Sequence, residues 1–326
     1  MNQENIAELE KTISRDYSNI AGITVLKNGV KRYENYFNGY TADAAFHVFS
    51  VTKSILSALI GIAIDRGYIT SLDQKVLDFF PDYTPKRGEK TAQRVTIRDM
   101  MTMTTPFKYR SAPYTKYFSS EDWVKGALDL LGGKGEIGSF RYTPLIGPDI
   151  LSGILTSVTG QSALEFAYEN LFSPLGIDVT KKVVFQTKEE QLAIMKDHHG
   201  SGWVADPKGI STAGWGLFLT PTDMAKIGQL YLNGGSWDGK KIISAQWVAE
   251  STRVHSHWDE LKLSYGYLWW IIDGDSYAAL GDGGNAIYVN TAKNLVVVIA
   301  SLFKPTAKDR IELIKKQIEP IAEACV

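Results

Sequence analysis

Cysteine, long apolar runs and clustered positive charge are all scarce in this sequence of 326 residues, and each shortage excludes a class of protein. The one cysteine, Cys325, rules out an intrachain disulfide and favours a reducing compartment. The longest apolar run, residues 55–64, is interrupted by Ser57 and Gly61 and is too short to span a bilayer. The formal net charge is -1, and no run of Lys and Arg could follow a phosphate backbone, so nucleic acid is not an expected partner.

The amino-terminal segment, residues 1–22, is polar and acidic, whereas a secretory signal needs a basic start and a continuous apolar core. We therefore expect a cytoplasmic protein with no membrane segment. A secreted chain whose signal had been removed would show the same features. Small molecules remain as the expected ligands, and the sequence leaves the oligomeric state open.

The composition is that of an ordinary folded protein. Hydrophobic residues make up 44% of the chain and charged residues 22%, so a large core can form and disorder is not indicated. The length fits two domains or one large domain with two lobes. No internal repeat is found at a fixed period, which excludes solenoids and propellers.

Short β-rich segments lie at both ends of the chain. Residues 23–30 predict a strand that enters an Asn28-Gly29 turn, because this pair tolerates the positive φ angles of a type I′ hairpin, and residues 30–37 return. Three further runs near the carboxyl end are rich in Val, Ile and Tyr: residues 276–280, 286–290 and 295–301. Together they predict an antiparallel sheet of five strands.

Helical periodicity dominates the rest. Terminal helices are predicted near Ile6, Leu9 and Ile13 and over residues 308–324, and the helices of the middle segment are expected at residues 55–66, 97–103, 123–131, 148–158, 163–171 and 221–232. We predict an α+β fold: a five-stranded antiparallel sheet flanked by terminal helices, with an inserted, mostly helical lobe. Residues 1–326 would form one domain, with a sheet lobe at about 1–48 and 271–326 and a helical lobe at about 54–270. The catalytic residues would lie in the cleft between lobes.

The clearest candidate for chemistry is Ser50, three residues before Lys53 and directly before an apolar helix. Residues three apart share one face of a helix, so the lysine amine can approach the serine hydroxyl. The helix start offers free N–H groups to a developing oxyanion, and burial lowers the pKa of a lysine, which can then act as a base. Ser-x-x-Lys is also expected about once by chance in a chain this long. Ser301 and Lys304 match it too, but they end a strand before Pro305, where no helical turn joins them.

Further motifs occur in the same order and spacing as in a known family. They are residues 72–76 (LDQKV), 96–102 (TIRDMMT), 140–144 (FRYTP), 153–160 (GILTSVTG), 174–177 (PLGI), 216–225 (GLFLTPTDMA) and 265–270 (YGYLWW). With Ser50 and Lys53, they resemble the class C β-lactamase group of the serine β-lactamase and penicillin-binding-protein superfamily, including its esterases and nylon-oligomer hydrolases. The resemblance implies a β-lactamase/transpeptidase-like fold.

The resemblance also implies roles for individual residues. Tyr142 would relay the proton between the serine and the leaving group, although it could instead be a core tyrosine. The N–H of Asn285, with that of Ser50, would form an oxyanion hole, and Gly283 and Gly284 would let the backbone approach the substrate. The same glycines are also typical of a plain turn between strands.

Two positions depart from the family pattern. Asp282 stands where β-lactamases and DD-peptidases keep a cation for the substrate carboxylate, so an anionic substrate would be repelled. Pro144 replaces an asparagine whose amide normally contacts the substrate or the lysine. These changes make β-lactam antibiotics poor candidate substrates.

We therefore predict a serine hydrolase that forms an acyl-enzyme on Ser50 and cleaves an ester or small amide, with no cofactor and no metal. One alternative is β-lactamase or D-amino-acid peptidase activity, with the missing cation supplied by Arg141 or Lys108. Another is a non-catalytic binding protein on the same fold. His255 and His257 lack the cysteine or acidic neighbours of a metal site. Five aromatic residues either line the cleft or pack in the core: His198, His199, Trp203, Trp215 and Trp269.

Overall fold

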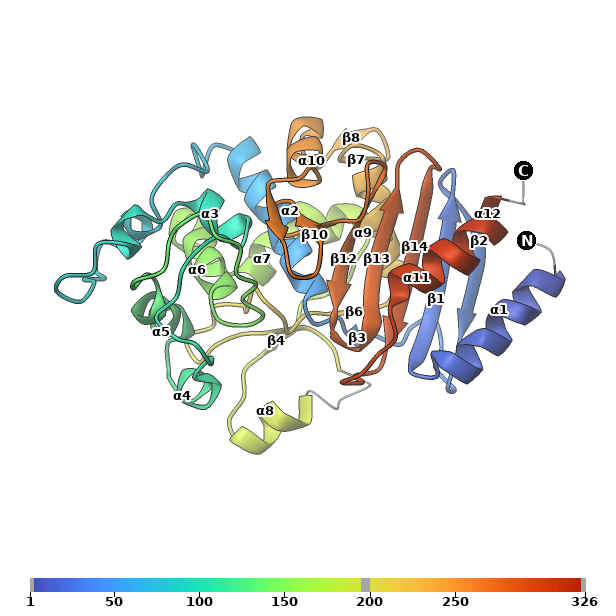
Figure 1. The fold of residues 1–326 in the computed structure, drawn as a ribbon, viewed down its shortest axis with the longest axis horizontal. Coiled ribbons are helices and arrows are strands. Elements are labelled where there is room, and N and C mark those ends of the chain that lie inside the picture. The colour runs from blue at the N-terminus through green and yellow to red at the C-terminus, as the bar shows by residue number, and fades with distance from the viewer. Residues whose placement is uncertain (1–2, 195–199, 324–326) are drawn as a thin grey trace.

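A single large antiparallel sheet organises the protein. The computed structural model describes residues 3–194 and 200–323, and the sheet within them has eight strands in the order β2-β1-β14-β13-β12-β11-β10-β9 (Figure 1). The five strands expected from the sequence are present: β1 (Ile20–Lys27), β2 (Val30–Tyr36), β12 (Ser276–Gly281), β13 (Asn285–Asn290) and β14 (Leu295–Ser301). The expected α+β architecture, an antiparallel sheet with terminal helices and a mostly helical lobe, is confirmed.

The predicted number of five strands was wrong, because three short strands extend the sheet beyond β12. They are β9 (Ser256–Trp258), β10 (Leu263–Tyr265) and β11 (Trp270–Ile271). Strands of two or three residues are too short to show an alternating pattern, and the surrounding aromatic residues fit a helix or a core segment equally well.

Strands from the two ends of the chain pair with each other near one edge of this sheet. β1 pairs with β2 through the predicted turn, in which Asn28 and Gly29 have φ angles of 53° and 74°, and on its other side β1 pairs with β14. The first and last strands are therefore neighbours, although the whole helical region separates them in sequence (Figure 1).

Alternate residues of β14 face two different layers. Leu295, Val297 and Ile299 pack with the terminal helices α1 (Gln3–Asp16), α11 (Arg310–Leu313) and α12 (Glu319–Glu323), the last two joined by a π-helical turn at Ile314–Ile318. Val296 and Val298 instead belong to the large core that contains α2 (Val51–Asp65) and α9 (Pro221–Leu232). Both faces of the sheet are thus covered, as a strand that is apolar on both sides requires.

The helical lobe lies beside the sheet and contains α3 (Ile97–Met101), α4 (Tyr114–Phe118), α5 (Trp123–Leu130), α6 (Pro148–Thr159), α7 (Ala163–Ala167), α8 (Lys188–Ile194) and α10 (Ala245–Ser251) (Figure 1). Residues 51–63 of α2 are all buried, and this helix joins the lobe to β12 and β13. Short strand pairs complete it: β3 (Phe46–His47) with β6 (Phe218–Leu219), β4 (Lys182–Val183) with β5 (Trp203–Val204), and β7 (Ser236–Trp237) with β8 (Lys240–Lys241). Among the described residues, no helix combines the length and apolar character that a membrane span requires.

Candidate active site

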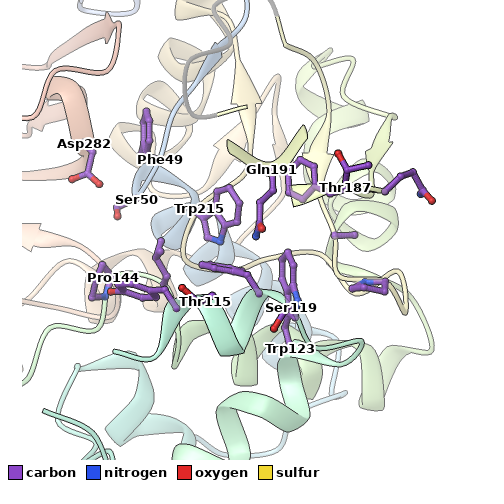
Figure 2. Close-up of a pocket in the computed structure, with 17 residues that line it drawn as sticks. Phe49, Ser50, Thr115, Ser119, Trp123, Pro144, Thr187, Gln191, Trp215 and Asp282 are labelled. Atoms are coloured by element: carbon purple, nitrogen blue, oxygen red, sulfur yellow. The ribbon is translucent and has the colours of Figure 1, made fainter. Parts of the chain in front are cut away.

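Ser50 lies at the junction of the two lobes, at the N-cap of α2 (Figure 2). Serine at an N-cap usually accepts a hydrogen bond from the first turn, but the Ser50 hydroxyl makes no capping bond. The preceding residue, Phe49, holds a φ of 48°, a conformation that is strained for a bulky side chain and often found at functional sites. The hydroxyl is therefore left available, and the local backbone is bent to present it.

Lys53 contacts that hydroxyl from the next turn of α2. Its Nζ lies 2.9 Å from Ser50 Oγ, 2.7 Å from the Pro144 carbonyl oxygen and 2.9 Å from the Gly214 carbonyl oxygen. A neutral amine has two N–H groups and one lone pair. The two carbonyls can accept the N–H groups, which leaves the lone pair for the proton of Ser50.

The surroundings of Lys53 favour this neutral form. Only 1% of the residue is exposed, and burial lowers the pKa of its amine to about 7, while the charges of Asp282 and Asp149 act in the opposite direction. An amine with a pKa near neutrality is a competent general base under physiological conditions.

Asp149, in the first turn of α6, is a buried carboxylate that the sequence analysis missed. It accepts hydrogen bonds from the Tyr117 hydroxyl at 2.6 Å and from the Ala213 N–H at 2.8 Å, next to the Gly214 carbonyl that holds Lys53. Burial raises the pKa of its carboxyl to about 6. Acidic residues are common in a first helical turn, so its position in the sequence did not distinguish it from an ordinary helix start.

Tyr142 approaches the same two residues from the other side. The Lys53 Nζ lies 5.1 Å from the centre of the Tyr142 ring, and the tyrosine hydroxyl is a hydrogen-bonding partner of Ser50. Burial raises the pKa of the phenol well above its usual value, and the hydrogen bond with Ser50 opposes this shift. The phenol therefore keeps its proton at neutral pH and can donate it, so Lys53 is the better candidate of the two for a base.

Pro144 also contributes, although it has no amide side chain. Its carbonyl oxygen accepts a hydrogen bond from Lys53, and its ring borders the cavity beside Ser50. The backbone at this position thus supplies a lysine contact despite the loss of the asparagine.

The hairpin turn Asp282–Gly284 follows β12. Its first residue faces the cavity beside Ser50, and its two glycines pack against the carboxyl-terminal segment. The Asp282 side chain lines the cavity together with Ser50 (Figure 2). Gly283 and Gly284 have φ angles of 77° and 93°, and side chains there would strike Leu302 and Arg310. These two glycines are thus required by the turn itself and by its packing against the carboxyl-terminal segment.

Gly281, the last residue of β12, is the glycine that lies against Ser50. A Cβ atom at this position would lie 2.2 Å from the Val48 carbonyl oxygen and 3.3 Å from the Ser50 nitrogen. Asn285, opposite Gly281 in the sheet, is 0% exposed. Its amide nitrogen donates to the Asp282 carbonyl and its amide oxygen accepts from the Ser301 N–H, so this side chain fixes the turn.

Residues from the two ends of the chain fix the same turn. The Gly283 carbonyl oxygen accepts hydrogen bonds from Asn19 Nδ2 at 2.7 Å and from the Arg310 guanidinium at 3.3 Å. Arg310 is 3% exposed and also donates to Asn19 Oδ1. Neither residue was a candidate from the sequence, since a contact between positions so distant becomes visible only in the fold.

A cavity of about 630 Å³ opens beside Ser50. Its walls combine aromatic, aliphatic and polar uncharged side chains, and they come from α4, α5, α8 and the loops that carry Trp215 and Phe185 (Figure 2). Of the tryptophans considered from the sequence, Trp215 lines this cavity, whereas Trp203 and Trp269 are fully buried in the core. His198 and His199 lie outside the described residues.

The two cations considered as replacements for the missing one are engaged elsewhere. Arg141 donates hydrogen bonds to the carbonyl oxygens of Phe107 and Tyr109, and Lys108 forms an ion pair with Glu89 at 3.1 Å. Neither borders the cavity beside Ser50. The described residues also contain no group of three or more His, Cys, Asp or Glu side chains that could hold a metal ion.

The pKa of Lys53 predicts the pH dependence of a reaction that uses it as a base. Because only the neutral amine accepts a proton, we expect kcat/KM for a short ester to rise between about pH 6 and 8 and then level off, whereas an ordinary lysine would titrate near pH 10.4. Buried His47, whose pKa is lowered to about 3, does not titrate in this range.

Asp149, whose pKa is raised to about 6, also ionises close to this range, and the variant Asp149→Asn separates its ionisation from that of Lys53. It removes a negative charge that raises the pKa of Lys53, so we expect the ascending limb to shift to lower pH. A wild-type profile without an ionisation between about pH 5.5 and 8.5, or a limb that stays in place in the variant, would contradict this account.

Known proteins resemble this chain over most of its length. The sequence model described as Beta-lactamase matches residues 10–319. A 6-aminohexanoate-dimer hydrolase from Paenarthrobacter ureafaciens is 22% identical over 314 residues, which cover 89% of this chain and 73% of that protein. A family VIII carboxylesterase structure superposes with a TM-score of 0.70 at 17% identity, over 97% of this chain and 96% of that one. An octameric penicillin-binding protein homologue from Pyrococcus abyssi superposes with a TM-score of 0.71 at 20% identity, over 97% of this chain and 77% of that one.

Proposed function

Since the chain belongs to the beta-lactamase family and is a hydrolase, we propose that it acts through an acyl-enzyme formed on Ser50. The observation that carries this proposal is the 2.9 Å contact between Lys53 Nζ and Ser50 Oγ in a buried site where the pKa of the amine falls to about 7. A nucleophile beside a base with matched pKa is the arrangement that covalent catalysis requires.

In the acylation step, neutral Lys53 takes the proton of Ser50 while Ser50 Oγ attacks the substrate carbonyl carbon. The tetrahedral intermediate then collapses, and the bond to the leaving group breaks. Tyr142 donates its proton to the leaving alcohol or amine and regains one from the Lys53 ammonium, which restores both groups. In deacylation, neutral Lys53 takes a proton from water while the water oxygen attacks the acyl carbon. The bond from that carbon to Ser50 Oγ then breaks, Oγ regains the proton, and the acid is released.

The oxyanion of the intermediate needs two N–H donors. The Ser50 N–H lies at the start of α2, where the helix dipole favours negative charge. We assign the second donor to the Asp282 N–H rather than to Asn285. Gly281 packs directly on Ser50, so the peptide that follows Gly281 lies beside the nucleophile, while Asn285 is buried across the hairpin and does not border the cavity.

The substrate in this proposal is an ester or a small amide without a carboxylate next to the scissile bond. The Asp282 carboxylate beside Ser50 would repel such a group, and the aromatic side chains of the cavity suit an apolar one. The similar proteins include a hydrolase named for an amide dimer and a carboxylesterase, and both names are compatible with this choice. β-Lactam or D-amino-acid peptide hydrolysis gains no support, because neither Arg141 nor Lys108 reaches the cavity.

Labelling with a fluorophosphonate probe tests the proposed nucleophile. We expect one adduct per chain, located on Ser50 by mass spectrometry, because an activated serine attacks the phosphorus centre as it would a carbonyl. Ser50→Ala should abolish the adduct, whereas Ser301→Ala, in the second Ser-x-x-Lys sequence, should not. An unlabelled wild-type protein, or an adduct on another residue, would show that Ser50 is not the nucleophile.

A further inference from the structure

Asp282 is the one charged side chain among the described residues that line the cavity beside Ser50. It is exposed, and no described Lys, Arg or His forms an ion pair with it. Its carboxylate also borders a second groove that contains Lys304 and Lys308, but Lys308 pairs with Asp16 at 2.9 Å. The carboxylate is thus available to a ligand in the cavity.

The described remainder of the cavity has no charged side chain: apolar residues, six of them aromatic, line it together with Thr115, Ser119, Gln186, Thr187 and Gln191. Trp215 forms its centre and packs against Phe118 with ring centres 5.6 Å apart, against Trp123 at 6.4 Å and against Phe185 at 6.4 Å. Rings held together in this way provide a rigid wall for an aryl or branched alkyl group. Figure 2 shows Asp282 and Ser50 at one end of the cavity and Trp215 and Trp123 toward the other.

Ser50 therefore stands between two different environments. A substrate whose carbonyl carbon meets Ser50 can place one arm against the aromatic wall, while the other arm passes the Asp282 carboxylate. An anionic second arm would be repelled there, and a neutral one would leave the carboxylate without a partner. A cationic arm would be attracted, and it would also offset the unfavourable effect of a carboxylate close to the developing oxyanion.

We propose that Asp282 determines specificity, and that the substrate is an ester or amide with an apolar arm in the aromatic cavity and an ammonium group beside Asp282. This inference rests on the proposed function, because it concerns the substrate of the same nucleophile. It extends that function from substrates that merely lack a carboxylate to substrates that carry a positive charge.

Matched esters test the charge requirement. The choline ester of 4-phenylbutyric acid carries a quaternary ammonium, and the 3,3-dimethylbutyl ester of the same acid has the same shape without the charge. A second pair reverses the arms, with 4-phenylbutyl esters of 4-trimethylammoniobutyric acid and of 5,5-dimethylhexanoic acid. In at least one pair we expect kcat/KM to favour the cationic ester by about tenfold or more, and added salt to reduce this preference.

The variant Asp282→Asn assigns the preference to a residue. We expect it to bring the two rates of the matched pair within about twofold of each other, while Glu8→Gln, a change of equal charge on α1, leaves the preference unchanged. The ratio within a pair is the readout, because any effect of Asp282 on the pKa of Lys53 acts on both esters alike.

The outcomes separate the two proposals. Equal hydrolysis of cationic and neutral esters by the wild type, or a preference that survives in Asp282→Asn, would overturn the role of Asp282 and leave Ser50 as the nucleophile. Failure to hydrolyse any ester, together with an unlabelled Ser50, would overturn the proposed function and this inference with it.

Discussion

Replacement of Lys53 by methionine is expected to lower kcat/KM for every substrate by about 10³-fold or more, because the base and the nucleophile act as one unit. Methionine preserves much of the buried volume but cannot accept the proton of Ser50. The carbonyl oxygens of Pro144 and Gly214 would lose their shared donor, so some loss of stability accompanies the loss of rate. Steady-state kinetics with a short ester measure the first effect, and thermal unfolding measures the second.

Lys240→Met is the matched control, since Lys240 is an exposed lysine of β8 that borders neither the cavity beside Ser50 nor the groove beside Asp282. It should retain wild-type kinetics. The rate of fluorophosphonate labelling gives an independent measure for Lys53→Met and should fall in parallel with hydrolysis. A folded Lys53→Met protein that keeps more than about a tenth of the wild-type kcat/KM would remove Lys53 from the role of base.

Gly281→Ala should have the next largest effect. The added methyl group would lie 2.2 Å from the Val48 carbonyl oxygen, which is backbone and cannot turn aside, so the end of β12 must move away from Ser50. Such a movement displaces the N–H groups proposed to bind the oxyanion. We expect kcat to fall by about 10²-fold or more, with a much smaller change in KM, and the unfolding free energy to fall by about 1–3 kcal/mol.

Gly274→Ala provides a control of the same chemical size, because a Cβ atom at Gly274 meets nothing within 4 Å. It should leave both kcat and thermal stability close to wild type. Circular dichroism establishes that the Gly281→Ala protein is folded before its kinetics are compared. A folded Gly281→Ala enzyme with kcat within about twofold of wild type would show that the approach of β12 to Ser50 is not needed for catalysis.

The elements that could be predicted from the sequence are those whose pattern is local and long enough to read. The strands at both ends, the Asn28-Gly29 turn and the helices around Ser50 and Pro221 all carry several residues of consistent periodicity. Strands β9 to β11 carry only two or three residues each, and they form by pairing in turn: β11 with β12, β10 with β11, and β9 with β10. Such tertiary strands leave no pattern in the sequence.

The same distinction applies to the candidate site. Ser50 and Lys53 could be paired from their spacing, and the structure brings Tyr142 to them across the cleft. The neighbours of each residue in the turn after β12 could not be predicted from spacing. Spacing gave no means of telling that Gly281 packs on Ser50 while Gly283 and Gly284 face away from it.

The burial of Lys53 was expected from the apolar helix, but the residues that surround its amine could not be predicted from the sequence. Its carbonyl partners belong to Pro144 and Gly214, and the carboxylate behind them belongs to Asp149, three positions spread over the helical lobe. Any residue type can supply a carbonyl oxygen, so these contacts impose no recognisable side chain on the sequence.

The pairing of β1 with β14 has a consequence for biosynthesis. A ribosome makes the first hairpin early and its partner strand only after the entire helical lobe, so the nascent β1 waits with one unpaired edge. The Gly283 carbonyl oxygen is held by Asn19 and by Arg310, and Arg310 is translated only after the whole helical lobe. The turn beside Ser50 can therefore assemble only after the segment that follows the helical lobe has been made, and a shorter nascent chain would lack the contacts that hold it.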